Sequence, residues 1–307
     1  MERPTRTVLQ EKGAVGTLRE TAVSHIGFYV PDIEAAEAFY GRVLGLIRHE
    51  ELTNGVRLGW GGGHHVIDLL EGPKGLAYYA FEVRDSNGLA GIRERLEAAG
   101  HAVRELEAGH ITAPVGKPQG IAVLDPDGTE VHFHSQVQRQ GENAADTGRR
   151  PIKFQHTTLG SGNVPRMVSF YTDTVGFRIS DQLQDGNFCW LRSDRDHHTL
   201  AVVYTGKGGD IDHYSYDLAE WEDFKAWCDR LTELGVNVAW GPGRHGPGNN
   251  LFVFFDDPAG NHIELSAEME KFHDDRVTYV PRRWEPIPNS VNLWGGQLPT
   301  WRKVSAS

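Results

Sequence analysis

Hydrophobic and polar positions along this chain follow one short plan that recurs. Residues 22–30 alternate between apolar and polar side chains, which predicts a half-buried strand. Pro31 and Asp32 then open a helix over 33–43, where apolar and aromatic residues recur near helical spacing. Three short β segments follow, at 46–51, 55–60 and 65–70. The predicted unit is therefore one strand, one helix and three strands.

The same plan predicts three further units. The second begins with a strand at 77–83, and its helix at 89–99 ends at Gly100, a residue suited to a left-handed helix cap. The third and fourth units begin with strands at 152–159 and 214–218. Their helices are expected at 164–174 and 221–234, and the other strands of these units at 130–134, 178–183, 187–192, 199–204, 236–240, 251–256 and 261–266.

A unit of this kind exposes one apolar sheet face that it cannot bury alone. Two units placed side by side make a sheet curved like an open barrel, with helices outside. We therefore expect an α+β fold of four βαβββ modules, paired into two open-barrel domains, with a C-terminal tail packed over the second. The expected boundaries are an extension at 1–20, domains at 21–135 and 152–268, a polar linker at 136–151, and a tail at 269–307.

Composition narrows the functional classes. The length of 307 residues suits about two ordinary domains, and 39% hydrophobic with 24% charged residues is typical of a soluble globular protein. A formal net charge of −11 with scattered cations argues against nucleic acids and anionic membranes as partners. No apolar segment has the length of a membrane span or a signal peptide core. Cys189 and Cys228 are expected as reduced thiols in a cytoplasmic protein.

The two halves of the chain repeat each other, but only the second half has a full set of metal-ligating side chains at three matched positions. Each set falls on the first, fifth and eighth predicted strands of its half and should converge in the concavity of the sheet. The sets are His25, Tyr78 and His132 in the first half, and His156, His213 and Glu264 in the second.

Two imidazoles and one carboxylate form the facial triad that suits Fe(II) and oxygen activation. Three coordination positions stay open, of which a catecholate can take two and dioxygen one. For the first-half set we expect packing as the default, with metal binding as the alternative.

With these residues in place, the chain resembles the vicinal-oxygen-chelate superfamily, and within it the type I extradiol ring-cleaving catechol dioxygenases. The resemblance covers about residues 20–270. It is specific because several segments occur in order and at family-like spacing. These segments are His156, Trp190 with 197–201, 213–217, 241–245 and 257–265.

The resemblance implies a role for each of these residues. His156, His213 and Glu264 would bind the metal. His198 would move protons to and from substrate and oxygen, which suits a side chain that titrates near neutrality. His245 would hydrogen-bond the substrate side of the pocket, with a solvent-exposed loop histidine as the alternative. The pair His64 and His65 occupies the place of 197–198 in the first half, so a relic of duplication is the alternative for His198. Trp190 would line the pocket wall, although core packing explains a strand tryptophan equally well.

Departures from the family pattern bear on the substrate. Phe254 stands where the family usually has a hydrogen-bonding tyrosine, and Thr158 where relatives that act on carboxylated catechols often have asparagine. The tail stretch 290–295 lacks the arginines that grip a carboxylate in those relatives. Arg282 and Arg283 lie nearby, so a shifted clamp stays open. We expect an apolar ring substituent or none, covered by a lid that includes the tail tryptophans Trp284 and Trp294.

The sequence therefore predicts a cytoplasmic Fe(II)-dependent extradiol dioxygenase that opens a catechol ring by O2 insertion. Mn(II) would satisfy the same ligands. The predicted partners are a catecholic substrate and O2, and the resemblance implies a homotetramer. Two alternatives stay open: a binding protein without redox chemistry, and a metal-dependent isomerase or lyase of glyoxalase type. The latter typically collects ligands from both modules or subunits, whereas here one half holds the whole triad.

Overall fold

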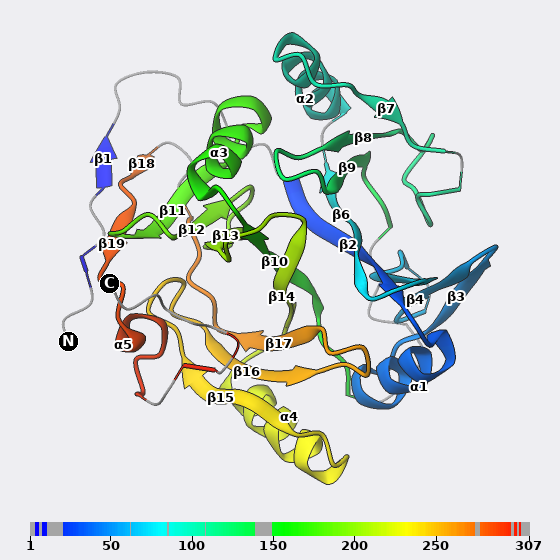
Figure 1. The fold of residues 1–307 in the computed structure, drawn as a ribbon, viewed down its shortest axis with the longest axis vertical. Coiled ribbons are helices and arrows are strands. Elements are labelled where there is room, and N and C mark those ends of the chain that lie inside the picture. The colour runs from blue at the N-terminus through cyan, green and yellow to red at the C-terminus, as the bar shows by residue number, and fades with distance from the viewer. Residues whose placement is uncertain are drawn as a thin grey trace.

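The computed structural model describes residues 4–5, 8–10, 21–61, 63–84, 86–107, 109–138, 149–273, 277–295, 298–299 and 301. Two mixed sheets carry the two halves of the chain, the first in blue to teal and the second in green to orange (Figure 1). Most of the predicted extension and the centre of the predicted linker lie outside the described residues. Within the described part, no helix is long and apolar enough to cross a membrane.

The first half contains two copies of the predicted unit. Its sheet has the strand order β3-β4-β5-β2-β6-β9-β8-β7. The elements are β2 (Thr21–Val30), α1 (Ile33–Leu44), β3 (Ile47–Leu52), β4 (Gly55–Gly59), β5 (Ile67–Glu71), β6 (Gly75–Val83), α2 (Ser86–Ala98), β7 (Arg104–Glu105), β8 (Gly120–Leu124) and β9 (Glu130–Ser135).

The second half repeats this topology. Its sheet has the order β15-β16-β17-β14-β10-β13-β12-β11-β19, which is the first order in reverse with one strand added at an edge. The elements are β10 (Lys153–Ser161), α3 (Val164–Ser169), η1 (Phe170–Val175), β11 (Arg178–Leu183), β12 (Phe188–Arg192), β13 (Leu200–Tyr204), β14 (Asp210–Asp217), α4 (Trp221–Glu233), β15 (Val238–Arg244), β16 (Leu251–Asp256) and β17 (His262–Ala267). The predicted fold class is confirmed.

Local chemistry explains where the helices stop. Gly100 and Gly235 follow α2 and α4 with φ of 81° and 67°, a left-handed conformation that costs a glycine little. The cap predicted at Gly100 is therefore confirmed. The helix predicted at 164–174 divides into α3 and the wider-turned η1, a feature that apolar spacing does not reveal.

The tail packs on the second half, as predicted. β19 (Arg282–Trp284) runs parallel to β11 and extends the sheet, and α5 (Pro288–Val291) follows it. β18 (Val277–Tyr279) pairs instead with β1 (Val8–Gln10), which the sequence did not predict as a strand. A strand near the start of the chain and a strand of the tail therefore lie side by side (Figure 1).

Two buried tyrosine joints connect the halves, and each uses a repeated residue. Tyr40 on α1 reaches Asp257 of the second half at 2.8 Å between Oη and Oδ2, and it also contacts the hydroxyl of Tyr214. In the matching joint, Tyr171 on η1 contacts the hydroxyl of Tyr79, which donates to Asp125 of its own half at 2.7 Å. All four tyrosines are fully buried, and burial raises the pKa of each well above 10. One hydrophobic core runs through both halves around these joints.

We expect Tyr40→Phe to lower the free energy of unfolding by about 1–3 kcal/mol, because the buried Asp257 carboxylate loses a hydrogen-bond donor. Urea denaturation followed by tryptophan fluorescence and circular dichroism would measure it. Tyr204→Phe is the matched control, because that side chain is 52% exposed. Equal stability of the two variants would contradict a stabilising role for the joint.

Candidate metal centre and active site

Three neighbouring strands of the second sheet carry the candidate metal ligands. β10, β14 and β17 lie side by side, and Ser215 on β14 pairs with His156 on one flank and with Glu264 on the other. Directly paired residues share a sheet face, and His213 lies two positions before Ser215 on the same strand. All three side chains therefore project from one face and meet.

The donor atoms of these residues converge on one point. His156 Nε2 lies 3.0 Å from Glu264 Oε2, His213 Nε2 lies 3.4 Å from the same oxygen, and the two nitrogens are 3.3 Å apart. With metal–ligand bonds of about 2.1 Å, donors about 3.0 Å apart subtend about 90° and donors about 3.4 Å apart about 109°. These separations fit three ligands on one face of a single divalent ion.

Each candidate ligand is held from behind by a second polar group. Such partners fix the tautomer and the orientation of a metal-binding imidazole. Both histidines are bonded through Nδ1, so Nε2 is the nitrogen that faces the centre. The pairs are His213 with Asp212 Oδ1 at 2.6 Å, His156 with Gln155 Oε1 at 3.1 Å, and Glu264 Oε1 with Asn250 Nδ2 at 3.2 Å.

The charge states suit a cation. Burial would raise the pKa of Glu264, but His156, His213 and His245 around it hold that pKa well below its ordinary value, so the group is a carboxylate. Burial lowers the pKa of His156, which is therefore a neutral imidazole near pH 7. The centre thus offers two imidazole nitrogens and one negative oxygen.

A small cavity adjoins this centre. Its volume is about 20 Å³, enough for roughly one water molecule. His198 stands beside His156 with 4.3 Å between ring centroids, and His245 Nε2 lies 3.4 Å from Glu264 Oε1. The lining consists of His156, Phe188, Trp190, His198, His213, His245, Pro247, Glu264 and Val291, with no Lys or Arg among these described residues.

A buried chain of polar groups positions His198, and the sequence analysis missed it. His197 Nδ1 lies 3.0 Å from His198 Nδ1, and its Nε2 lies 3.1 Å from Asp181. Burial would raise the pKa of Asp181, but His197 and Arg282 hold it well below its ordinary value. This chain leaves Nε2 of His198 for the cavity. The sequence offered one indication of this role, the matching pair His64 and His65 in the first half. That repeat was interpreted as a possible remnant of duplication, not as evidence that His197 positions His198.

Arg282, Arg283 and Trp294 lie away from the cavity lining. The Arg282 guanidinium pairs with Asp181, with its Nε 3.0 Å from both carboxylate oxygens. Arg283 is exposed and donates to a backbone oxygen of the same sheet edge. Trp294 is 52% exposed, with its ring centroid 6.1 Å from that of Trp221 on the surface. The structure therefore does not bring these three predicted substrate-binding residues to the candidate centre.

Thr158, Phe254 and Trp190 do lie at or beside the centre. Thr158 Oγ1 is 3.1 Å from His213 Nε2, and the Phe254 ring packs 5.0 Å from the same imidazole. Trp190 stacks on Phe188 and meets the buried tail residue Trp284 in one apolar cluster. The tail reaches the cavity through Val291, whose backbone oxygen lies 2.5 Å from His245 Nδ1.

The first half repeats the scaffold with different side chains. His25 and His132 pair with Ala80 on β6 as His156 and Glu264 pair with Ser215, and Tyr78 takes the position of His213. The Tyr78 hydroxyl donates to Asp68 at 2.6 Å, and Gly27 opposite it leaves the room that the larger ring needs.

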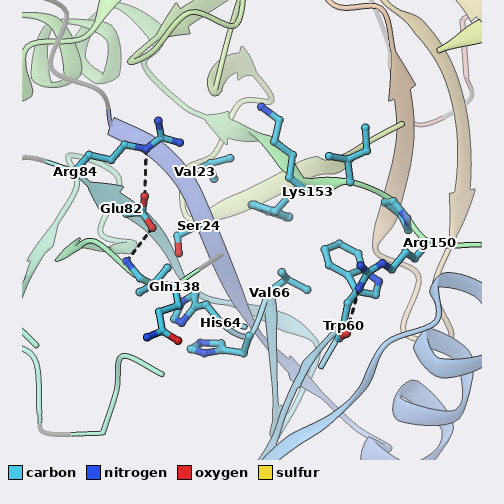
Figure 2. A pocket seen from close by; sticks show the side chains of 15 residues that line it. Val23, Ser24, Trp60, His64, Val66, Glu82, Arg84, Gln138, Arg150 and Lys153 are labelled. Carbon is cyan, nitrogen blue, oxygen red and sulfur yellow. Dashed lines mark hydrogen bonds and ion pairs between the residues drawn. The ribbon is translucent and has the colours of Figure 1, made fainter. Parts of the chain in front are cut away.

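A separate cavity of about 550 Å³ lies beside the first sheet, where the chain enters the second half. Figure 2 shows His64 and Val66 on its wall, with Trp60 and Arg150 next to each other and Lys153 farther along the same side. Arg150 donates to the backbone oxygen of Trp60 at 3.2 Å. The cavity does not contain the second-half centre.

Comparison with known proteins agrees with this fold. Metapyrocatechase 2 of Cupriavidus necator is 27% identical over 254 residues, covering 74% of each chain. The iron-dependent extradiol dioxygenase of Rhodococcus jostii is 24% identical and covers 72% of this chain and 77% of its own. Among solved structures, the Mn(II)-bound glyoxalase from Novosphingobium aromaticivorans superimposes with a TM-score of 0.75 at 29% identity, covering 89% of this chain and 90% of the other.

A model of one protein family matches the chain twice, once in each half. The matched residues, 22–133 and 153–265, coincide with the two repeated sheets. The resemblance found in the sequence is confirmed, and the chain belongs to the glyoxalase/bleomycin resistance protein/dioxygenase superfamily.

Proposed function

We propose that this protein is an Fe(II)-dependent extradiol dioxygenase, which opens the ring of a catechol beside its hydroxyls and inserts both atoms of O2. The observation that carries the proposal is the convergence of His156, His213 and Glu264 within 3.0–3.4 Å of one another, next to His198. The curated relatives named as metapyrocatechase and extradiol dioxygenase support the same reaction. Mn(II) fits the same donors, and the homotetramer and cytoplasmic location implied by the resemblance belong to the same proposal.

Bound at this centre, Fe(II) would supply Lewis-acid and redox chemistry for catecholate and O2. The protein supplies position and proton transfer. His156, His213 and Glu264 would hold the ion. His198 accepts a proton from a substrate hydroxyl at Nε2, because its Nδ1 is bonded to His197. His245 donates from Nδ1 to the Val291 carbonyl, which turns its Nε2 toward the cavity to hydrogen-bond the substrate.

The substrate enters by displacing part of the lining. The cavity of about 20 Å³ is smaller than a catechol ring, so some wall residues have to shift. The segment of the tail that carries Val291 is the candidate lid, because it meets the cavity through one side chain and one backbone hydrogen bond. Trp284 anchors this segment by packing in the apolar cluster with Trp190. Trp294 packs against Trp221 on the surface and is not part of this lid.

A glyoxalase-type activity is the second candidate, favoured by the 29% identity to a Mn(II)-bound glyoxalase. Oxygen separates the two functions. Protein purified without oxygen, loaded with Fe(II) and mixed with catechol should consume O2 and form a yellow ring-fission product only when air is admitted. Isomerisation of a hemithioacetal without oxygen, and no O2 uptake with any catechol, would support the second candidate instead.

The metal assignment predicts that His213→Ala and Glu264→Ala each lose one equivalent of iron per chain together with activity, while far-ultraviolet circular dichroism stays that of the parent. Removing one of three ligands leaves too few donors to hold the ion. Elemental analysis and O2 uptake provide the measurements. The control is His262→Ala. His262 lies on β17 with Glu264, but its Nδ1 is 2.6 Å from Asp256 Oδ1 and it is not one of the three ligands. Unchanged iron content and turnover in the ligand variants would refute the assignment.

The proton-transfer role predicts that His198→Gln keeps iron and still binds catechol, but turns over about 10²–10⁴-fold more slowly. Stopped-flow absorbance of the anaerobic substrate complex separates binding from turnover. The matched control is His65→Gln, its counterpart in the first half, which should change kcat little. Equal decreases of kcat in the two variants would show that His198 has a structural role and no role in proton transfer.

The lack of Lys and Arg in the described lining predicts higher kcat/KM for catechol and alkylcatechols than for 3,4-dihydroxyphenylacetate. A buried carboxylate without a cationic partner is costly, and each buried methylene is worth about 0.8 kcal/mol, or about fourfold. Steady-state O2 uptake across such a series is the measurement. A preference for the carboxylated catechol that Arg283→Ala abolishes would show instead that an arginine clamp reaches the pocket. Arg282 is a poor test, because it is paired with Asp181.

A further inference from the structure

We propose that the first half holds a second metal site, formed by His25, His110 and His132, that takes Zn²⁺ or a similar divalent transition-metal ion. The three residues each offer a ligand atom, and these atoms lie within 4.8 Å of one another. His25 and His132 come from β2 and β9, and His110 from the loop before β8. The proposal is independent of the reaction assigned to the second half.

Unsatisfied ring nitrogens point to a missing occupant. In the described part of the chain, His25 Nε2, His110 Nε2 and His132 Nδ1 are all buried without a hydrogen-bond partner. A buried polar atom left in this state costs about 1–3 kcal/mol. Three such atoms on neighbouring imidazoles would destabilise the fold if these histidines served only as packing. One bound ion would satisfy all three.

The opposite nitrogens of two of these rings already have partners, as in metal sites. His132 Nε2 lies 2.5 Å from Glu130 Oε1, and Glu130 in turn accepts from Arg104 at 2.8 Å. His25 Nδ1 lies 3.1 Å from Ser24 Oγ and 3.0 Å from His64 Nε2. These contacts orient the rings and leave one nitrogen on each for the ion.

Tyr78, the counterpart of the second-half ligand His213, is not a ligand here. Its hydroxyl donates to Asp68, and its ring stacks on His132 with 4.3 Å between centroids. Burial and the neighbouring Asp68 raise the pKa of Tyr78 well above 10, so the phenol keeps its proton. His110 replaces the missing donor from a loop. The repeated position has therefore lost its ligand, but the site has gained another.

A second group, His25, His64 and His65, also has ligand atoms within 4.8 Å. His64 is already bonded at both ring nitrogens, because its Nδ1 contacts Thr112 O at 2.9 Å and its Nε2 contacts His25 Nδ1 at 3.0 Å. His65 Nε2 also lies 3.3 Å from Asp68. Binding an ion there would break these contacts. The free nitrogens therefore favour the group that contains His110.

The donor set and its surroundings select the ion. Three neutral imidazoles suit zinc and other transition metals and leave a fourth position open. The nearby Arg57 is neutralised by Asp68 and Glu50, with its Nη1 2.8 Å from Glu50 Oε2. His64, which contacts His25, lies on the wall of the 550 Å³ cavity, so one side chain separates that cavity from the proposed site (Figure 2).

The test counts metal ions in the full-length chain. Protein stripped with a chelator is loaded with excess Co²⁺ or Zn²⁺, desalted and analysed by elemental mass spectrometry. We expect two ions per chain in the parent, one in His110→Ala, one in His213→Ala and none in the double variant. With Co²⁺, His110→Ala should also lose the intense visible bands typical of four-coordinate cobalt. One ion in the parent and an unchanged count in His110→Ala would overturn the proposal.

Two controls separate this site from its neighbours. His134→Gln changes a buried histidine of β9 that belongs to neither group, so the count should stay at two. His64→Gln tests the second group, and loss of an ion there with none lost in His110→Ala would overturn the ligand assignment. His132→Gln is a second ligand variant, placed on strand β9 instead of a loop, and it should also reduce the count to one ion per chain. Retention of two ions in both ligand variants would refute the site.

Discussion

The pairing of three neighbouring strands at one register determines what the rest of this structure can do. In each half, a small residue at the centre, Ser215 or Ala80, pairs with one histidine-bearing strand on one side and with a third strand on the other. Because directly paired side chains share a face, these three strands direct three side chains into one concavity. A slip of one residue would send them all to the opposite face. The hydrophobic pattern that fixes the register therefore also fixes the metal chemistry.

The two halves use this scaffold for different donor sets. The second half combines two imidazoles with a carboxylate and places a supported histidine, His198, beside them. The first half has lost one strand ligand to Tyr78 and gathers its donors from two strands and a loop. Duplication provides two equivalent concavities, and a change at one or two strand positions alters the preferred ion and the chemistry. The shared core and the tyrosine joints connect the two halves that carry these concavities.

The sequence predicted most of the strands, the helices and the convergence at Ser215, because periodicity and repetition both reflect the sheet. It did not reveal contacts that depend on loop paths and on the tail. His110 has no periodic partner, and its role follows only from where its loop returns to the sheet. The pairing of Arg282 with Asp181 depends on β19 joining the sheet edge, which short-range spacing does not encode. The cationic side chain expected at the substrate instead supports His197 and, through it, His198.

The exchange of tyrosines between the halves bears on how such a chain arises. Tyr40 of the first half enters the second, and Tyr171 of the second enters the first, each beside the aspartate of the matching turn. A half-length chain with one such tyrosine and one such aspartate can form both joints by pairing with an identical copy around a twofold axis. The interface would be self-complementary from the start. Fusion of two genes then makes the partner permanent, and each copy becomes free to lose or exchange ligands without losing the fold.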